Sequence, residues 1–344
     1  MLANYMLGNQ QVELRKVPEP QLLEPTDAVV RVSATCICGS DLHHYHGPAI
    51  TARPIGHEFI GVVEQVGSEV ATLREGDFVI APFTINCGSC EFCREGLTTS
   101  CVRAGSWGRT NSREAACQAE AVRVPLADGT LVKVDADVNE ELLPHLLALS
   151  DVYGTGWHAA HSAQVGPGDT VAVIGDGAVG LLAVLSARQL GAERIILMGR
   201  HEARTDLGRE FGATDVVAER GEEGIARVRE LTGGYGAHKV LEAVGLMPAF
   251  EQALAITRPG GTISRVGVPQ YDMAPAARQI FGPNITLTGG VAPVRSYIPQ
   301  LLPAVLDGSV EPGRVFDSVL PLARAAEGYA AMEARTSLKV MLRG

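Results

Sequence analysis

A glycine-rich turn between a short apolar strand and a helix constrains the fold of this chain most. In TVAVIGDGAVGLLAVLSARQL, residues 171–174 read as a buried strand, and Gly175, Gly177 and Gly180 follow with the spacing G-x-G-x-x-G. A helix opens directly after them, so its N-terminus and the backbone amides of the turn can bind a pyrophosphate. A glycine turn without a nucleotide is the alternative, but the flanking strand and helix favour a dinucleotide-binding unit.

Alternating helix and strand patterns continue beyond this turn. The helix-like RTDLGREFG precedes the strand-like ATDVVAE, GIARVRELTGG precedes AHKVLEAVG, and FEQALAITRPGG precedes TISRVGVP. Two more strand-like segments, RIILM and NITLTGGV, bring the number of expected strands to six. Such alternation is typical of a doubly wound parallel sheet, so the sequence predicts an α/β fold in this part of the chain.

The residues after the second of these strands bear on the choice of coenzyme. NAD-binding chains usually place Asp or Glu at that point, where the carboxylate accepts a hydrogen bond from the ribose 2′-OH. Here RIILM is followed by Gly199, Arg200 and His201, and the first acid of the segment is Glu202. Because an arginine can pair with a 2′-phosphate, we predict that NADP(H) is favoured over NAD(H). A solvated Arg200, or a Glu202 that curls back to the ribose, is the alternative.

Length, charge and the N-terminal residues limit the class of protein further. A chain of 344 residues suggests two domains, and 46% hydrophobic residues can supply two cores. The net charge of −10 disfavours a nucleic-acid partner, which needs a basic face. Residues 1–21 have no secretion-signal pattern, and no apolar stretch reaches the roughly 20 residues that span a membrane. We therefore expect a cytoplasmic protein, whose thiols stay reduced.

Four of the seven cysteines lie together in NCGSCEFCREGLTTSC, with the spacing C-x2-C-x2-C-x7-C. They are Cys87, Cys90, Cys93 and Cys101. Disulfides are disfavoured in a reducing compartment, a redox site needs only two thiols, and a nucleic-acid zinc ribbon would have basic flanks. The spacing therefore predicts a structural zinc held by four thiolates. Such a closed site leaves no coordination position for a substrate, so catalysis is expected elsewhere.

Several motifs along the chain together resemble one enzyme family. CGSDLH, GHE followed by GVVEQVG, the four-cysteine loop, SDVYGTGWHAA and GDGAVG occur in the order seen in zinc-dependent alcohol dehydrogenases of the medium-chain dehydrogenase/reductase (MDR) superfamily. The likeness extends over essentially the whole chain. It implies a GroES-like β-barrel catalytic domain over residues 1–150 and 291–344. It also implies a Rossmann coenzyme domain over residues 151–290, with the active site in the cleft between the two.

The same resemblance implies a second, catalytic zinc. Its ligands would be Cys38, His57 and Asp151, the last at a position where the family has Cys, Asp or Glu. A helix N-cap is the alternative role for Asp151. Glu58 resembles the family carboxylate that stands behind the metal and can approach it. Two zinc ions per chain are therefore expected, one catalytic and one structural.

Ser40 and His43 suit the transfer of the alcohol proton to solvent. A hydroxyl at the substrate oxygen followed by an imidazole forms a proton relay, and histidine titrates near neutral pH. In the resembling family these two positions carry such a relay, and Thr155 corresponds to a residue that packs on the nicotinamide. His44 and His46 are expected to be surface or loop histidines.

The resemblance also suggests further coenzyme contacts. Val266, Gly267 and Val268 would lie near the nicotinamide ribose. Lys339 resembles a basic residue that contacts the pyrophosphate, with an exposed strand lysine as the alternative. The sequence allows two roles for Trp107, a wall of the substrate pocket or a core residue.

These expectations together predict an enzyme that transfers a hydride between a nicotinamide coenzyme and an alcohol/carbonyl pair, a secondary alcohol/ketone or an aldehyde. An NAD-dependent polyol or amino-alcohol dehydrogenase is one alternative. A zinc-free quinone or enone reductase is disfavoured by the intact ligand set, and a non-catalytic zinc- and nucleotide-binding protein by the relay residues. A homo-oligomer, dimer or tetramer, is expected, with the sheet edge at residues 285–289 as one contact.

Overall fold

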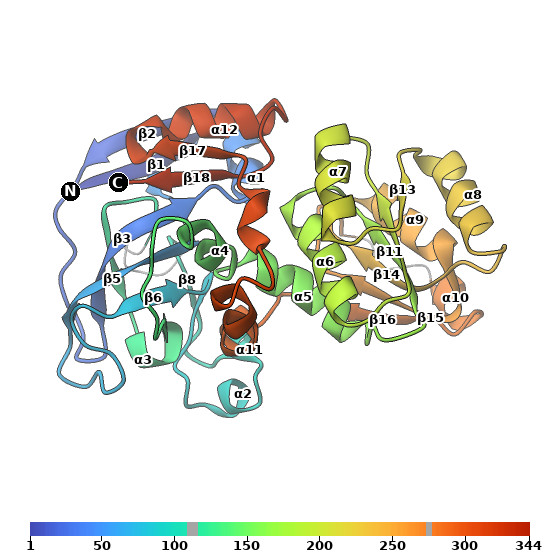
Figure 1. Ribbon diagram of the computed structural model, residues 1–344. Coiled ribbons are helices and arrows are strands. Elements are labelled where there is room, and N and C mark those ends of the chain that lie inside the picture. Colours follow the sequence, from blue (N-terminus) through green and yellow to red (C-terminus); the bar gives the residue numbers. More distant parts are fainter. Residues whose placement is uncertain (109–115, 273–276) are drawn as a thin grey trace. The chain divides into compact units, whose positions relative to one another are not determined.

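The computed structural model describes residues 1–108, 116–272 and 277–344 (Figure 1). The described chain divides into two compact units, Met1–Gly154 with Pro293–Gly344, and Thr155–Ala292. The first boundary falls inside helix α5 (Val152–Ser162), and the chain returns to the first unit just before helix α11 (Val294–Leu306). The predicted α/β class is confirmed, with each unit built around its own sheet.

The first unit is built mainly from antiparallel strands. Its larger sheet has the order β10-β6-β5-β3-β18-β17, with β9 also paired to β3, and smaller sheets have the orders β2-β1-β4 and β7-β8. The strands are β1 Leu2–Gly8, β2 Gln11–Lys16, β3 Ala28–Cys36, β4 Arg53–Pro54, β5 Phe59–Val66, β6 Phe78–Ala81, β7 Thr84–Ile85, β8 Gly105–Ser106, β9 Ala121–Val124, β10 Val132–Lys133, β17 Ser318–Pro321 and β18 Val340–Arg343.

Trp107 belongs to the core of this unit. Its side chain is buried among residues of β3, β5, β6 and β9, and its ring meets Phe59 edge-on with centroids 5.2 Å apart. Its indole N–H donates a 2.9 Å hydrogen bond to the carbonyl oxygen of Pro82. Because a buried indole needs such a partner, the side chain is fixed in place. Of the two roles that the sequence left open for Trp107, pocket wall or core residue, the structure shows the core residue.

Short helices cover the first unit. They are α1 Asp41–His46, α2 Glu91–Arg94, α3 Ala127–Thr130, α4 Leu143–Ala148, α11, and α12 Ala325–Glu333. Helix α12 buries Tyr329, which stacks on Tyr45 of α1 with ring centroids 5.3 Å apart. The Tyr329 hydroxyl also accepts a 3.0 Å hydrogen bond from Gln118 Nε2. The stacking of Tyr329 on Tyr45 holds α1, the helix that carries His43, against α12.

The second unit is a parallel sheet with the order β13-β12-β11-β14-β15-β16. Its apolar strands are buried by helices, as expected for a sheet covered on both faces. The order reverses between β11 and β14, and ligands of such folds bind at the carboxyl ends of the strands near this reversal. The elements are β11 Thr170–Ile174, α6 Ala178–Gln189, β12 Arg194–Met198, α7 Glu202–Phe211, β13 Asp215–Val217, α8 Gly221–Leu231, β14 Ala237–Glu242, α9 Met247–Ile256, β15 Thr257–Arg265, α10 Ala277–Phe281 and β16 Thr286–Gly289.

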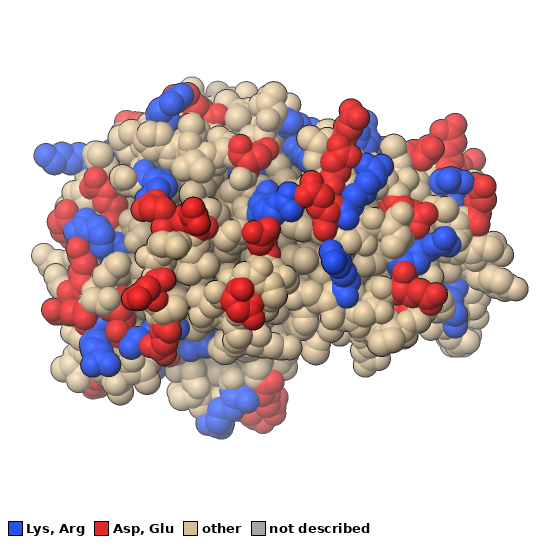
Figure 2. All heavy atoms as spheres, viewed as in Figure 1, with Lys and Arg blue, Asp and Glu red and all other residues tan. Residues whose placement is uncertain are grey.

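The surface and the helix lengths add two observations. Acidic and basic side chains are interspersed over the face seen in Figure 2, without the basic stripe that a nucleic-acid backbone would require. Among the described residues, no helix combines the length and the apolar character needed to cross a membrane.

Candidate active site

Four side chains from separate parts of the first unit meet in what we call the scattered cluster: Cys38, His57, Glu58 and Asp151. One ligand atom from each lies within 4.8 Å of the others. Antiparallel pairing of β3 and β5 sets Thr35 opposite Phe59, which brings Cys38, two residues after β3, near His57 and Glu58, the two residues before β5. Asp151, directly before α5, completes the group, with its Oδ2 3.5 Å from His57 Nε2 and 3.7 Å from Cys38 Sγ.

Asp41 holds this cluster in position. Its Oδ2 accepts a 3.0 Å hydrogen bond from the backbone N–H of Cys38, and its Oδ1 lies 3.5 Å from His57 Nδ1. With Nδ1 held there, Nε2 of His57 faces the cluster. Partners of this kind orient metal-binding histidines. The sequence interpretation gave Asp41 no site role, although its place in CGSDLH, three residues after Cys38, was the available signal.

The surroundings of Cys38 and His57 favour the protonated forms of these two donors. Burial raises the pKa of the Cys38 thiol, and the nearby charge of Glu58 raises it further. Burial would lower the pKa of His57, but the charges of Asp41 and Cys38 and hydrogen bonds to Asp151 and Asp41 hold it well above its ordinary value. A divalent cation can replace these protons, because metal binding and deprotonation are coupled.

Lys339 lies behind the cluster and corrects an expectation. Its ammonium donates to Glu58 Oε1 at 2.8 Å and to the carbonyl oxygen of Ile37 at 3.3 Å, and both charged side chains are at most 2% exposed. Met341 pairs with Cys36 across β18 and β3, which places Lys339 beside Cys38. A buried carboxylate requires a counter-charge. Lys339 is therefore not an exposed strand lysine, because its ammonium is buried against Glu58 and the Ile37 carbonyl.

The proposed relay residues lie on α1. Ser40 occupies the N-cap position, and its hydroxyl lies 3.2 Å from Cys38 Sγ. His43 follows one turn later and is exposed, and partial desolvation, with the charge of His46, lowers the pKa of its imidazole. His46 pairs instead with Glu333 at 2.6 Å. Thr155 lies on α5, one turn after Asp151, and is nearly buried.

The four-cysteine loop, residues 87–101, brings its sulfur atoms within 4.8 Å of one another. All four thiols are free, and Cys87 Sγ and Cys101 Sγ are 3.5 Å apart. Burial opposes ionisation of Cys87, but hydrogen bonds from Ser89 and from the amide of Cys90 lower its pKa to about 6. Gly88 and Gly96 have φ of +67° and +85°, which glycine adopts without strain. Burial raises the pKa of Cys93 to about 12, so the four thiols of this loop differ in how readily they ionise.

In the second unit, the glycine turn fits a dinucleotide for distinct reasons at two positions. Gly177 is the N-cap of α6, its backbone makes the cap without a side chain, and a Cβ there would point into open space. At Gly180 a Cβ would come within 2.0 Å of the carbonyl oxygen of Gly175, so only glycine lets α6 approach the turn. The first amides of α6 therefore face a space that a pyrophosphate can fill.

The end of β12 corrects the premise used for the coenzyme. A carboxylate does stand there, supplied by Asp176 from the glycine turn. Its Oδ2 accepts hydrogen bonds from the backbone N–H of Arg200 at 2.9 Å and of His201 at 3.0 Å, and lies 2.8 Å from His201 Nδ1. Parallel pairing of β11 with β12 places the residues after both strands at one sheet edge. The sequence search covered only the residues after β12.

The ends of β14 and β15 meet at the same edge. The backbone N–H groups of Val266 and Gly267 donate to the carbonyl oxygen of Glu242 at 2.9 and 3.1 Å. The buried Glu242 carboxylate accepts hydrogen bonds from Val244 N and Gly245 N, both at 2.7 Å, and burial raises its pKa. Val268 is 55% exposed. Glu242, which fixes this turn, was missed by the sequence interpretation.

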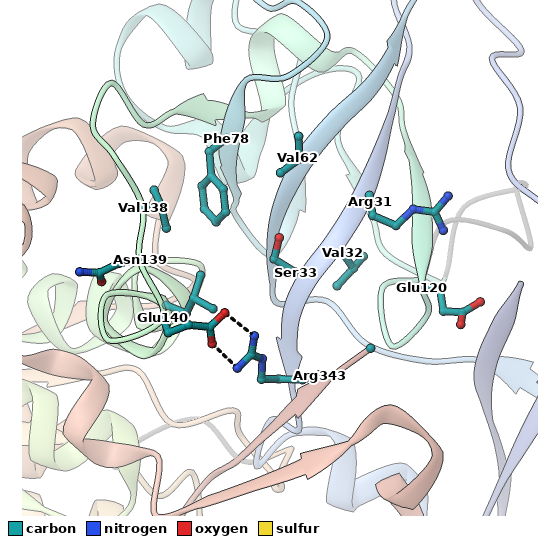
Figure 3. Close-up of a pocket in the computed structure, with 12 residues that line it drawn as sticks. Arg31, Val32, Ser33, Val62, Phe78, Glu120, Val138, Asn139, Glu140 and Arg343 are labelled. Carbon is teal, nitrogen blue, oxygen red and sulfur yellow. Dashed lines mark hydrogen bonds and ion pairs between the residues drawn. The ribbon is translucent and has the colours of Figure 1, made fainter.

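A separate hollow of about 540 Å³ opens in the first unit (Figure 3). Arg343 and Glu140, which both line it, form a bidentate ion pair, and the hydrogen bond from Arg343 Nη2 to Glu140 Oε1 is 2.9 Å long. None of its lining residues belongs to the scattered cluster or to the four-cysteine loop. It is therefore not the candidate active site.

Comparisons with known proteins bear on the whole chain. Residues 24–136 match the family model of the alcohol dehydrogenase GroES-like domain, and residues 178–307 match that of the zinc-binding dehydrogenases. Zinc-type alcohol dehydrogenase B of Aspergillus flavus is 36% identical over 97% of this chain and 79% of its own length. The chain belongs to the zinc-dependent alcohol dehydrogenases.

Two further relatives of these alcohol dehydrogenases are informative. The structure of the alcohol dehydrogenase TADH from Thermus sp. ATN1 superimposes with a TM-score of 0.91 and 36% identity, covering 100% of this chain and 99% of that one. An NADP-dependent isopropanol dehydrogenase of Entamoeba histolytica is 36% identical over 73% of this chain and 68% of its own length. The predicted membership of the MDR alcohol dehydrogenases, and with it an enzyme, is confirmed.

Zinc-dependent alcohol dehydrogenases use zinc and a nicotinamide coenzyme, and the residues of this chain suit both. The scattered cluster combines a thiol, an imidazole and carboxylates, the donor types that zinc accepts in catalytic sites. Glu58 Oε2 is buried there without a hydrogen-bond partner among the described residues. Such an orphaned oxygen is rare in proteins, and a nearby cation would satisfy it.

Proposed function

We propose that this alcohol dehydrogenase transfers a hydride between NADP(H) and a secondary alcohol/ketone or an aldehyde, at a zinc held by Cys38, His57 and Asp151. The observation that carries the proposal is the convergence of these three side chains from three separate elements. A three-ligand set leaves one coordination position for a substrate oxygen. When bound there, zinc supplies the electrophilic polarisation of an alcohol or carbonyl oxygen.

The surrounding side chains supply orientation and proton transfer. Asp41 holds the ring of His57, and Lys339 balances the buried charge of Glu58. Ser40 stands 3.2 Å from Cys38 Sγ, within reach of a substrate at the same cluster. His43, one turn further along α1, stays unprotonated at neutral pH because its pKa is lowered, so it can accept a proton. Ser40 and His43 thus form the proposed relay.

The four-cysteine loop is proposed to hold the second zinc as a structural ion. Four thiolates close a tetrahedral site, so this ion has no position for a substrate. The 2.9 Å hydrogen bond from Ser296 Oγ to the carbonyl oxygen of Gly96 ties the loop to α11. A zinc ion there would fix this lobe of the first unit. Metal analysis of the purified protein should give about two zinc ions per chain, whereas about one would remove one of the two sites.

NADP(H) remains the favoured coenzyme on the strength of Arg200. Its guanidinium is exposed at the end of β12 and can pair with a 2′-phosphate. The NADP-dependent isopropanol dehydrogenase relative agrees with this choice and with a secondary alcohol as substrate. A homo-oligomer is proposed as well, because β16 is an edge strand of its sheet and can pair with a second copy.

One assay series tests the proposal. Secondary alcohols, ketones, primary alcohols, aldehydes and polyols are each offered with NADP(H) and with NAD(H), while the absorbance of the reduced coenzyme is followed. We expect turnover of secondary alcohols or aldehydes that stops on removal of zinc, with NADP(H) ahead of NAD(H). An Arg200→Ala variant with unchanged coenzyme preference would contradict the assignment of NADP(H), and absence of turnover with every pair would contradict the enzyme itself.

A further inference from the structure

The carboxylate of Asp176 is placed where the adenosine end of a dinucleotide is read, yet no sequence rule would have chosen it. It comes from the middle of the glycine turn, not from the residue after β12. Its side chain is 13% exposed, so it is neither a core residue nor a freely solvated one. A charge held at the binding edge of a parallel sheet acts on whatever binds there.

The two oxygen atoms of Asp176 have different tasks. Oδ2 accepts from Arg200 N and His201 N and contacts His201 Nδ1, all within 3.0 Å. These bonds fix the turn from Gly199 to His201. They also lower the pKa of Asp176 against the opposing effect of burial. All of these contacts use Oδ2, so Oδ1 is the oxygen atom of the carboxylate that is offered to a ligand.

Gly199 is matched to this arrangement. A Cβ at Gly199 would lie 2.5 Å from Asp176 Cβ and 2.9 Å from Oδ2, closer than real atoms approach. The glycine therefore makes room for the carboxylate, and its own φ is not in the left-handed region. The pair Asp176 and Gly199 is a built feature of the turn, with Arg200 held next to it by its own amide.

We propose that Asp176 limits how strongly this enzyme prefers NADP(H) over NAD(H). Its Oδ2 positions the turn that carries Arg200, and its Oδ1 accepts a hydrogen bond from a hydroxyl of the adenosine ribose. Its negative charge repels the 2′-phosphate that Arg200 attracts. A carboxylate is the usual acceptor for ribose hydroxyls at this edge. The inference rests on the proposed use of a nicotinamide coenzyme and adds the group that opposes Arg200.

The test measures equilibrium binding and needs no turnover. The probes are adenosine 5′-monophosphate (AMP) and adenosine 2′,5′-bisphosphate, which differ only in the 2′-phosphate, titrated by calorimetry into the zinc-loaded enzyme. In Asp176→Asn the amide oxygen still accepts from the Arg200 and His201 amides, but the charge is lost. We expect the preference for the bisphosphate over AMP to rise by about five- to tenfold, the effect of one nearby charge in a partly hydrated site. Arg200→Ala should move the same ratio the opposite way.

Two variants guard the interpretation. Asp206→Asn removes one exposed carboxylate of α7 that pairs with Arg209, so it controls for net charge and should leave the ratio unchanged. Asp176→Ser keeps a small acceptor and replaces Asp176→Asn if thermal melting shows that the latter is not folded. A folded Asp176 variant whose ratio stays within twofold of the wild type, or falls, overturns the proposal. If the wild type binds neither probe, the proposed coenzyme use is what fails.

Discussion

The two clusters of side chains that could hold a metal ion are built in opposite ways. The four-cysteine loop gathers its donors from residues 87–101, and its own backbone amides help to stabilise the thiolates. The scattered cluster takes its donors from positions 38, 57 and 151, and burial there raises the pKa of the Cys38 thiol. The loop therefore gathers its donors by local geometry, with the pKa of Cys87 lowered to about 6 and that of Cys93 raised to about 12. The buried site depends instead on a folded core and on counter-charges from distant residues.

The partners behind each cluster follow the same division. Asp41 and Lys339 stand behind the scattered cluster, one on His57 and the other on Glu58. The loop is linked to the rest of the first unit by Ser296. We therefore expect chemistry to be lost first when the scattered cluster is changed, and stability to be lost first when the loop is changed.

The largest effect is expected from Cys38→Ser and His57→Gln. Each removes a ligand of the proposed catalytic zinc, so kcat/KM should fall by at least about a thousandfold, since the electrophile at the substrate oxygen is lost. Zinc content should fall from about two to about one per chain. Cys117→Ser, which changes a buried thiol outside both clusters, should keep both ions. Retention of wild-type kcat/KM in Cys38→Ser would show that the scattered cluster is not the reaction site.

The buried pair of Lys339 and Glu58 should produce the next largest effect. Lys339→Met leaves the Glu58 carboxylate buried without its counter-ion, which typically costs about 3–5 kcal/mol in the free energy of unfolding. The double variant Lys339→Met with Glu58→Gln removes both charges and should recover more than half of that loss. Chemical denaturation of the zinc-loaded protein measures both. Equal losses in the single and double variants would mean that packing, and not charge, explains the effect.

Loss of a loop ligand should affect stability more than chemistry. Cys90→Ser opens the four-thiolate site, and we expect a loss of about 2–3 kcal/mol in the free energy of unfolding, because loss of a structural metal is among the larger single-residue effects. The folded fraction should keep kcat/KM within about tenfold of the wild type. A thousandfold fall of kcat/KM in folded Cys90→Ser would contradict the proposal that the loop serves stability and the scattered cluster serves chemistry.

The smallest effect is expected in the pH profile. The pKa of His43 lies below its ordinary value of 6.5, so the imidazole stays unprotonated further into the acid range. Alcohol oxidation should therefore hold down to below pH 6.5 and then fall as His43 gains a proton. His43→Gln should lower kcat by about ten- to a hundredfold and flatten this acid limb. Cys90→Ser should keep the limb, and an unchanged limb in His43→Gln would remove His43 from the relay.

Features that depend on neighbours in the chain could be read from the sequence. The spacing of the four cysteines was enough to bring their sulfurs together, because short loops have little freedom. The glycine turn and the alternation of helices and strands gave the parallel sheet. The proposed ligands Cys38, His57 and Asp151 were found by resemblance, and nothing in their spacing alone would have joined them.

The sequence by itself therefore determined the fold class, the loop cluster and the family of this enzyme. Only the tertiary structure determined which charged side chains lie next to one another. Strand register brought Lys339 to Glu58, and the parallel pairing of β11 with β12 brought Asp176 beside Arg200. Electrostatic energy depends on distance through space and on burial, and a linear pattern contains neither quantity.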